Sequence, residues 1–228
     1  LSGAIGGSSP LDTLSINAST STMAFSVPQI GSGTAAGAGS STASVSIGNA
    51  NSGDITFSTT NSAGNGSISY IFGGNTTITS GGGADGFKIG AGDTTFKNTG
   101  STKSISFATG GFTLGNDADL KIETNNGAIS VGDIIGTAGG SATDVILDAG
   151  TSTTRIGAVG TGNTDINDLT VSGTGVITLT GNVITEDSTA AGDNGATAED
   201  GAQSYAGAVV LSGTDITLTT GGGGATFS

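Results

Sequence analysis

Short segments in which one Ser or Thr separates two apolar residues recur along this chain, with clusters of Gly, Asn, Asp and Ser between them. The segment Ile216-Thr217-Leu218, near the C-terminal end, shows the pattern. A period of two residues puts Ile216 and Leu218 on one side of a strand and Thr217 on the other. No segment shows the i, i+3, i+4, i+7 spacing of an amphipathic helix. The sequence therefore predicts many short, half-buried strands and almost no helix.

The predicted strands are separated by residues that favour tight turns. They are Leu14–Ile16, Met23–Val27, Val45–Ile47, Ile55–Phe57, Ile68–Tyr70, Thr77–Thr79, Phe87–Ile89, Thr95–Lys97, Ile105–Phe107, Phe112–Leu114, Leu120–Ile122, Ile129–Val131, Val145–Leu147, Arg155–Ile156, Leu169–Val171, Ile177–Leu179, Val183–Ile184, Val209–Leu211 and Ile216–Leu218. Strands with so few inward residues cannot form one layer of a sandwich core by themselves. They can form the sides of a coil whose successive turns stack. We therefore predict an all-β fold of the β-solenoid type, with a β-sandwich as the alternative, and about ten coils of roughly 20 to 25 residues each.

The composition excludes several functional classes. The chain has no Cys and no His, which removes disulfides, thiolate metal sites and the commonest general base. Its net charge of −13, with five basic residues, repels nucleic acids and anionic membranes. No apolar run is long enough to span a membrane. We expect an extracellular or cell-surface protein with no nucleic-acid partner and no membrane insertion of this segment.

The alternating pattern favours a single elongated unit over residues 1–228. Two segments interrupt it and are predicted to be loop insertions: the Gly/Ala/Ser-rich stretch near 31–41 and the acidic, apolar-poor stretch Glu186–Gln203. The pattern of Ala225–Ser228, at the end of the chain, would continue into that of Leu1–Gly7, because both contain an apolar residue followed by Ser. This continuity predicts one unit of a longer repeat array or filament.

Several Gly-rich segments share a degenerate repeat pattern. These are Gly201–Val209, Leu218–Ser228, and Gly3–Gly7 with Pro10–Leu14. They resemble the repeats of filamentous-haemagglutinin-like giant bacterial surface exoproteins and related adhesins, and the resemblance is clearest over residues 1–16 and 165–228. It implies a right-handed parallel β-helix that forms a stalk or fibre outside the cell, in cell adhesion or a biofilm matrix.

Calcium is the cofactor that these loops could bind, because Ca²⁺ prefers carboxylate and carbonyl oxygens. The candidate ligands are Asp117 with Asp119, Asp165 with Asp168, and Glu186 and Asp187 with Asp193, Asn194, Glu199 and Asp200. None of these groups follows the GGxGxD nonapeptide or the twelve-residue helix-loop-helix spacing. A solvated acidic loop is the competing interpretation.

Enzymatic and ice-binding functions are the remaining alternatives. A polysaccharide-active β-helix would use paired carboxylates, but acidic residues such as Asp133 and Asp215 stand singly in Gly-rich turns, and the chain has no Trp. We therefore predict that the chain is not an enzyme. An ice-binding surface needs the same Thr pair on nearly every coil, and Lys88, Lys121 and Glu123 interrupt such rows.

The two ends of the chain carry no recognisable cap. Leu1–Gly7 and Ala225–Ser228 are neither helical in pattern nor strongly charged. A solenoid without caps exposes unpaired strand edges. We therefore expect neighbouring copies of the chain to stack head to tail, with host-cell or matrix ligands as further partners.

Overall fold

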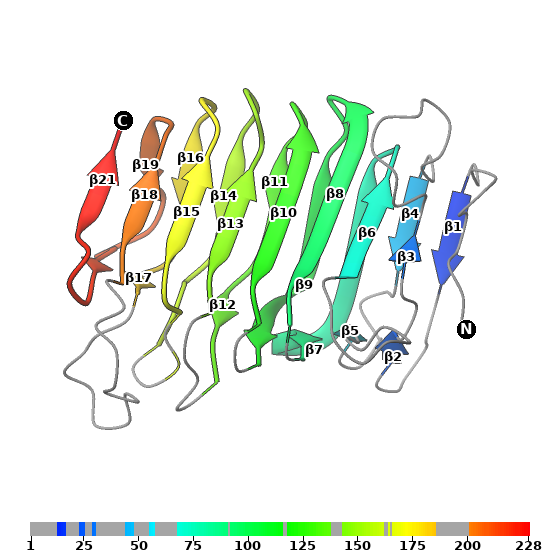
Figure 1. Ribbon diagram of the computed structural model, residues 1–228, viewed down its shortest axis with the longest axis horizontal. Coiled ribbons are helices and arrows are strands. Elements are labelled where there is room, and N and C mark those ends of the chain that lie inside the picture. Colours follow the sequence, from blue (N-terminus) through cyan, green and yellow to red (C-terminus); the bar gives the residue numbers. More distant parts are fainter. Residues whose placement is uncertain are drawn as a thin grey trace.

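All regular structure in this protein is β-strand. The computed structural model describes residues 13–16, 23–25, 29–30, 44–47, 55–57, 68–90, 92–115, 118–137, 143–161, 164, 166–185 and 201–228. No helix occurs among these residues, and the strands stand side by side from β1 (Thr13–Ile16) to β21 (Ala225–Phe227), as Figure 1 shows. Every paired strand runs parallel to its neighbours. The fold is a parallel β-helix, and the parallel pairing rules out the β-sandwich.

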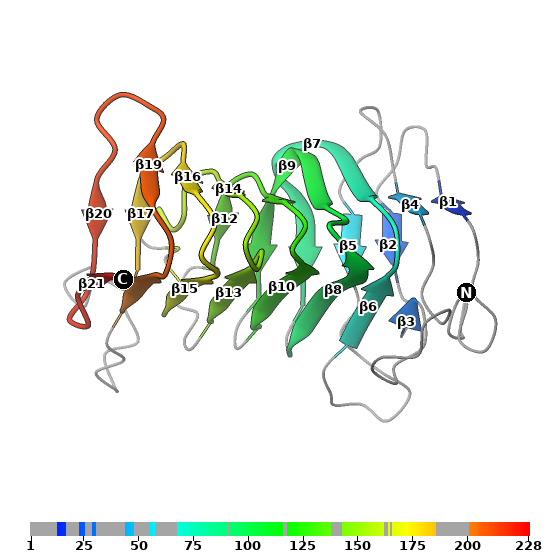
Figure 2. The same ribbon diagram turned by 90° about the horizontal axis from the view of Figure 1, so that it is seen from above.

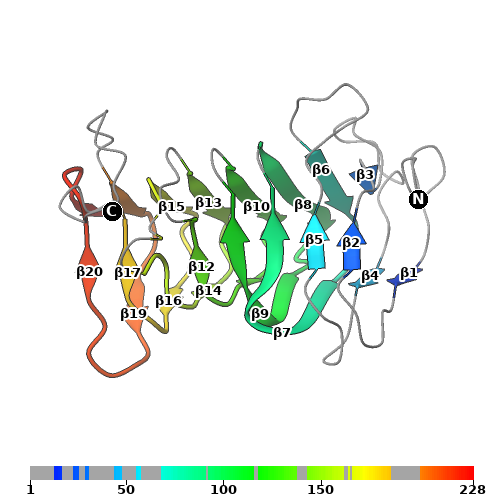
Figure 3. The same ribbon diagram turned by 90° about the horizontal axis from the view of Figure 1, so that it is seen from below.

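Each coil contributes strands to three faces. The first face is an eight-stranded sheet of β3 (Gln29–Ile30), β6 (Ile68–Phe72), β8 (Thr94–Ser101), β10 (Leu120–Asn125), β13 (Val145–Asp148), β15 (Leu169–Ser172), β18 (Gln203–Tyr205) and β21. The second face contains β1, β4 (Ser44–Ile47), the first parts of β7 (Thr76–Ile89) and β9 (Ile105–Leu114), β11 (Ile129–Ser130), β14 (Thr154–Ile156), β16 (Ile177–Leu179) and β19 (Val209–Leu211). The third face contains β2 (Met23–Phe25), β5 (Ile55–Phe57), the ends of β7 and β9, β12 (Ile134–Ile135), β17 (Val183–Ile184) and β20 (Leu218–Thr219). β7 and β9 bend from the second face onto the third (Figure 3).

Residues that pair across neighbouring coils form columns along the molecule. The first column is Ile30, Tyr70, Phe96, Ile122, Leu147, Val171, Tyr205 and Phe227. The second column is Leu14, Val45, Thr76, Ile105, Ile129, Thr154, Ile177 and Val209. The third column is Met23, Ile55, Phe87, Phe112, Ile134, Val159, Val183 and Leu218. Almost every member is apolar, and from Tyr70 to Tyr205 every side chain of the first column is buried.

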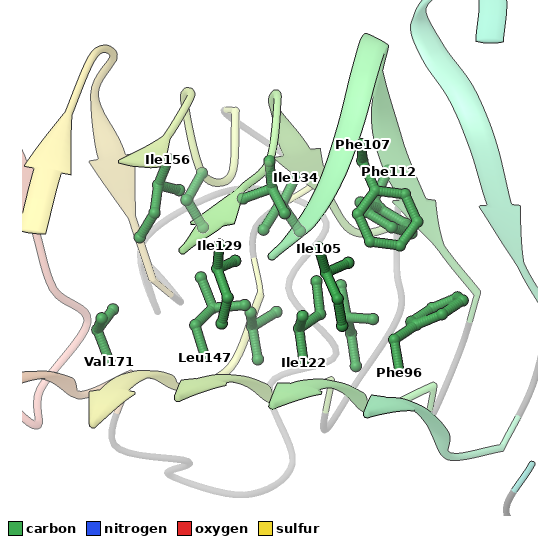
Figure 4. Close-up of a cluster of buried hydrophobic side chains, with 14 of the residues drawn as sticks. Phe96, Ile105, Phe107, Phe112, Ile122, Ile129, Ile134, Leu147, Ile156 and Val171 are labelled. Carbon is green, nitrogen blue, oxygen red and sulfur yellow. The ribbon is translucent and has the colours of Figure 1, made fainter. Parts of the chain in front are cut away.

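The core lies where the three faces meet. Phe96 from the first face, Phe107 from the second and Phe112 from the third pack together, with ring centroids 4.9 Å apart for Phe96 and Phe107 and 4.6 Å for Phe107 and Phe112. Figure 4 shows these rings and the aliphatic side chains that continue the core toward Val171. Each fully buried side chain of this kind stabilises the fold by about 1.5 to 3 kcal/mol relative to its exposed state. The alternation seen in the sequence is therefore the alternation between core and solvent.

Two corner glycines show how closely successive coils approach. A Cβ atom on Gly175 would lie 1.7 Å from the carbonyl oxygen of Ser152, and one on Gly207 would lie 2.0 Å from the carbonyl oxygen of Gly175. No side chain fits at such distances, so glycine is required wherever one backbone rests on the backbone of the preceding coil. These contacts explain part of the high Gly content.

Coil length varies more than a constant repeat would allow. The offset between equivalent positions is 25 residues between β10 and β13 but 34 residues between β15 and β18. Residues 186–200, which account for the longer coil, lie outside the described residues, as do 31–41. The described residues place eight strands on the first face, so the expectation of ten coils is wrong. Because some coils are longer than expected, the same chain length makes fewer coils.

Most predicted strands occur, but some boundaries differ. β7 and β9 each join two predicted strands into one that bends at the corner. β3, β12, β18 and β21 were not among the predicted strands, and β20 begins at Leu218, whereas the alternation placed a strand over Ile216–Leu218. The predicted insertion up to Gln203 is too long, because Gln203 is the first residue of β18 and is buried.

Candidate functional site

Acidic residues form a ladder at the corner that precedes the first face. Asp119, Asp144 and Asp168 each stand directly before the first residue of a strand, on three successive coils. Oδ1 of Asp119 accepts a hydrogen bond from the backbone N–H of Asp144 at 2.9 Å, and Oδ1 of Asp168 accepts one from the N–H of Ala202 at 2.7 Å. Between them, Oδ1 of Asp144 accepts from the N–H of Asp168 at 3.3 Å. Each carboxylate therefore holds the next coil in register.

The same arrangement recurs at the other corners. Three further Asp or Asn residues that precede a strand position accept a backbone N–H from the next coil: Asn75 from Ser104 at 3.1 Å, Asp133 from Ala158 at 2.8 Å, and Asn182 from Thr217 at 3.0 Å. In every case the side chain belongs to the earlier coil and the N–H to the later one. The carboxylate of Asp133 is a stronger acceptor than the neutral amides of Asn75 and Asn182, and all three bonds stabilise the stack. The spacing of Asp119, Asp144 and Asp168 by one coil is a signal that sequence reasoning could have found.

The predicted calcium ligands are mostly beyond what the structure describes. Asp117, Asp165, Glu186, Asp187, Asp193, Asn194, Glu199 and Asp200 lie outside the described residues. The two remaining candidates, Asp119 and Asp168, belong to the corner ladder. No group of three or more acidic residues placed to hold a metal ion occurs among the described residues. The arrangement around Asp119 thus gives its carboxylate a structural partner, and the calcium interpretation stays a prediction for the segments around it.

The solvent side of the first face carries a mixed row of residues. In register, the part of this row whose side chains are described is Thr95, Lys121, Ile146, Thr170, Ser204 and Thr226. Thr and Ser therefore do not repeat on every coil of this face, and an ice-binding surface of matched Thr rows is not formed here. The interruption at Lys121 is where the sequence predicted it.

Glu123 makes the ion pairs of this surface. Its carboxylate lies 3.3 Å from Nζ of Lys97 on the preceding coil and 3.1 Å from Nζ of Lys121 on its own strand. Partial burial acts to raise the pKa of Glu123, but the hydrogen bond from Lys121 and the charges of Lys97 and Lys121 outweigh it and lower the pKa. Exposed pairs of this kind contribute about 0 to 1 kcal/mol each. The cluster contributes to register on the surface.

An open recess of about 490 Å³ lies on the second face beside the broad corner of β9. Its lining includes the hydroxyl groups of Ser106 and Ser130, the carboxylate of Asp133 and the guanidinium of Arg155. Oδ1 of Asp133 is already the acceptor for the N–H of Ala158. The serines have no imidazole beside them, because the chain contains no His. The recess therefore combines hydroxyl groups and one cation with an apolar lining, and its serines lack the imidazole base that commonly activates a nucleophile.

The C-terminal end of the stack is an apolar face, here called the C-terminal face and formed by β19, β20 and β21. Leu211 and Phe227 are 53% and 55% exposed, whereas Leu179 and Tyr205, which pair with them on the preceding coil, are fully buried. The Phe227 ring stacks on the Tyr205 ring with centroids 5.2 Å apart. An open recess of about 660 Å³ lies between Val209, Leu211, Leu218 and Phe227. These side chains are exposed only because no further coil covers them in this structure.

A buried polar network lies directly beneath this face. Nε2 of Gln203 donates hydrogen bonds to the carbonyl oxygen of Thr219 at 2.8 Å and to Oγ1 of Thr185 at 3.2 Å, and Oε1 of Gln203 accepts one from the Tyr205 hydroxyl at 3.0 Å. Thr185 in turn donates to the carbonyl oxygen of Gly201. Burial raises the pKa of the Tyr205 hydroxyl. The network closes the interior of the last described coils with satisfied polar groups, a feature that the alternation of apolar residues did not reveal.

Comparison with known proteins does not assign this chain to a family. The chain matches no family model, and neither a curated protein nor a solved structure is significantly similar to it. In the described part of the chain, no helix is long and apolar enough to cross a membrane.

Proposed function

We propose that this chain is a structural module of a secreted bacterial surface adhesin or extracellular filament, whose units join end to end. The observation that carries the proposal is the unbroken stacking of the three columns, from Leu14 to Val209 in the second column and from Met23 to Leu218 in the third. Such a stack sets a fixed distance between its two ends. Its surface loops are free to vary without disturbing the core.

The physical basis of the proposed function is the direction of the coil-to-coil bonds. In a β-solenoid the hydrogen bonds between coils run along the long axis, so a pull on the two ends is shared by three faces at once. The corner ladder of Asp119, Asp144 and Asp168 adds side-chain bonds in the same direction. A fibre or stalk needs this resistance to extension. The extracellular location is supported by the Cys-free, acidic composition and by the resemblance to large bacterial surface adhesins.

Duplication of two coils tests the structural role. A second copy of residues 120–168, inserted after Asp168, restores the register of β10, β13 and β15 and adds two coils to the rod. We expect the rod to lengthen by about 10 Å with the cross-section unchanged, as measured by small-angle X-ray scattering. A Gly/Ser segment of equal length at the same place is the control and should not lengthen the ordered rod. A widened or unfolded particle from the coil duplication would contradict a modular rod.

Surface labelling tests the location. Intact cells of the source organism are incubated with an antibody against the folded chain, or with a protease, before lysis. We expect antibody binding and proteolysis on intact cells, with a cytoplasmic protein of the same cells as the control. Labelling that occurs only after lysis would contradict an extracellular module.

A further inference from the structure

The C-terminal face ends in three strand edges that have no neighbour on one side. β19 pairs only with β16, β20 only with β17 and β21 only with β18 among the described residues. The last members of the three columns, Val209, Leu218 and Phe227, lie on these edges. A further coil of parallel strands would pair with all three edges and cover these residues in the way that each described coil covers the one before it.

The opposite end of the same stack presents three edges in the same columns. β1 pairs only with β4, β2 with β5 and β3 with β6 among the described residues. Leu14, Met23 and Ile30 hold the first positions of the second, third and first columns. Each column thus begins and ends with an apolar residue. One end of the stack is therefore complementary in register to the other.

Charge does not oppose contact between these ends, although the whole chain is strongly acidic. Residues 201–228 contain a single charged residue, Asp215, and residues 1–50 contain only Asp12. The other acidic residues lie between Asp54 and Asp200. Two copies therefore approach end to end with far less repulsion than they meet side by side.

We propose that a second copy of this chain occupies the C-terminal face, with its β1, β2 and β3 added in parallel to β19, β20 and β21 of the first copy. In this joint Val209 stands opposite Leu14, Leu218 opposite Met23 and Phe227 opposite Ile30. The inference rests on the proposed end-to-end module and specifies its joint. Because the two surfaces differ, the contact is heterologous, and each addition leaves a new free face. Repetition of this contact gives an open linear stack rather than a closed dimer.

Cysteine cross-linking tests the register. The chain has no cysteine, so two introduced thiols are the only ones present. Val210 follows Val209 and Ser15 follows Leu14, and both are exposed. In the proposed joint they stand opposite each other on adjacent strands about 4.8 Å apart, which suits a disulfide. The doubly substituted chain, Ser15→Cys with Val210→Cys, is treated with diamide, which takes up the two electrons and two protons released as the S–S bond forms.

We expect a ladder of covalent oligomers on a non-reducing gel, which collapses to the monomer band after reduction. The matched control combines Ser15→Cys with Ser212→Cys, which moves one thiol two positions along the chain and places the pair roughly 7 to 8 Å apart, too far for efficient bonding. Each single variant is expected to give no ladder. Equal ladders from both double variants would overturn the register, and covalent dimers alone would show a closed contact instead of a propagating one.

Light scattering of the unmodified chain distinguishes failure of this joint from failure of the proposed module. The scattering mass is expected to rise with protein concentration, and Leu211→Asp, which places a charge on the C-terminal face, is expected to abolish the rise. Val210→Asp lies on the solvent side of the same strand and is expected to weaken association less. A monomer at every concentration would contradict the proposed joint. If the rod nevertheless lengthens on coil duplication, the proposed structural module would still hold.

Discussion

Single Asp and Asn side chains at the corners help to fix which residues of successive coils pair with each other. At five corner positions, Ser104, Asp144, Ala158, Ala202 and Thr217, the backbone N–H donates to an Asp or Asn side chain of the preceding coil. An unpaired, partly buried N–H costs about 1 to 3 kcal/mol. Successive carboxylates such as Asp144 and Asp168 repel each other, and the hydrogen bonds that they accept offset this repulsion. These acidic residues therefore act mainly as hydrogen-bond acceptors between coils.

Substitution of Asp119 separates a structural role from a calcium-binding one. Asp119→Ala removes the acceptor for the N–H of Asp144 and is expected to lower the free energy of unfolding by about 1 to 2 kcal/mol. Asp119→Asn keeps an Oδ1 acceptor and should cost less than about half of that. Urea denaturation is measured with added Ca²⁺ and with a chelator. An Asn variant as unstable as the Ala variant, together with stabilisation of the original chain by Ca²⁺, would show that Asp119 is a metal ligand.

The individual strands are too short to be stable alone, so each element depends on the coils beside it. β11 and β12 are two residues long, yet Ile129 and Ile134 are almost completely buried because neighbouring coils cover them. In a stack of this kind stability is roughly a sum of contacts between neighbours. A side chain in the middle of a column has a neighbour on both sides, and one at an end has a neighbour on one. The effect of a substitution therefore depends on the position of its strand in the stack.

Truncation of leucines in the middle and at the end of the stack tests this dependence. Leu147 is fully buried between Ile122 and Val171, and Leu147→Ala is expected to lower the free energy of unfolding by about 2 to 5 kcal/mol. Leu218 is only partly buried, and Leu218→Ala is expected to cost less than about 1.5 kcal/mol. The comparison is made by urea denaturation at a concentration where the chain is monomeric. Equal losses from the two variants would mean that the C-terminal coil is already covered.

The whole molecule combines coils of unequal length, with offsets of 25 residues between β10 and β13 and 34 residues between β15 and β18. Thr185 and Gly201 flank the longest acidic segment and are hydrogen-bonded to each other, so the ends of that segment are close together. The corner between β19 and β20, residues 212–217, also projects beyond its neighbours (Figure 2). Since the cost of closing a loop changes slowly with its length, such corners can grow without loss of the fold. The rod and its loops can therefore change independently.

Shortening the acidic segment tests this independence. Replacement of residues 186–200 by a short Gly/Ser linker is expected to change the free energy of unfolding by less than about 1 kcal/mol. Gln203 has to remain, because its amide lies in the buried network with Tyr205 and Thr185. Gln203→Ala in the original chain is the contrasting variant, with an expected loss of about 1 to 3 kcal/mol. Failure of the shortened chain to fold would show that the acidic segment is part of the stack.

The sequence by itself determined the class of fold and the position of most strands. A period of two in segments such as Ile177–Leu179 is a local property that any strand with one buried side must show. The absence of helical periodicity and the Gly-rich corners then favoured a stacked coil over a globular core. The predicted charge interruptions at Lys121 and Glu123 also stand where the outer surface carries them.

The tertiary structure alone decided the register, and with it the corner ladder and the C-terminal face. Which residues pair depends on contacts between residues about one coil apart, such as Leu120 with Val145, and alternation within a strand does not contain that information. Strand β18 escaped prediction because Gln203 takes an inward position, which only a neighbouring Thr185 and Tyr205 make favourable. Leu211 likewise has the pattern of a core residue, and its exposure follows from the absence of a coil above it rather than from its own strand.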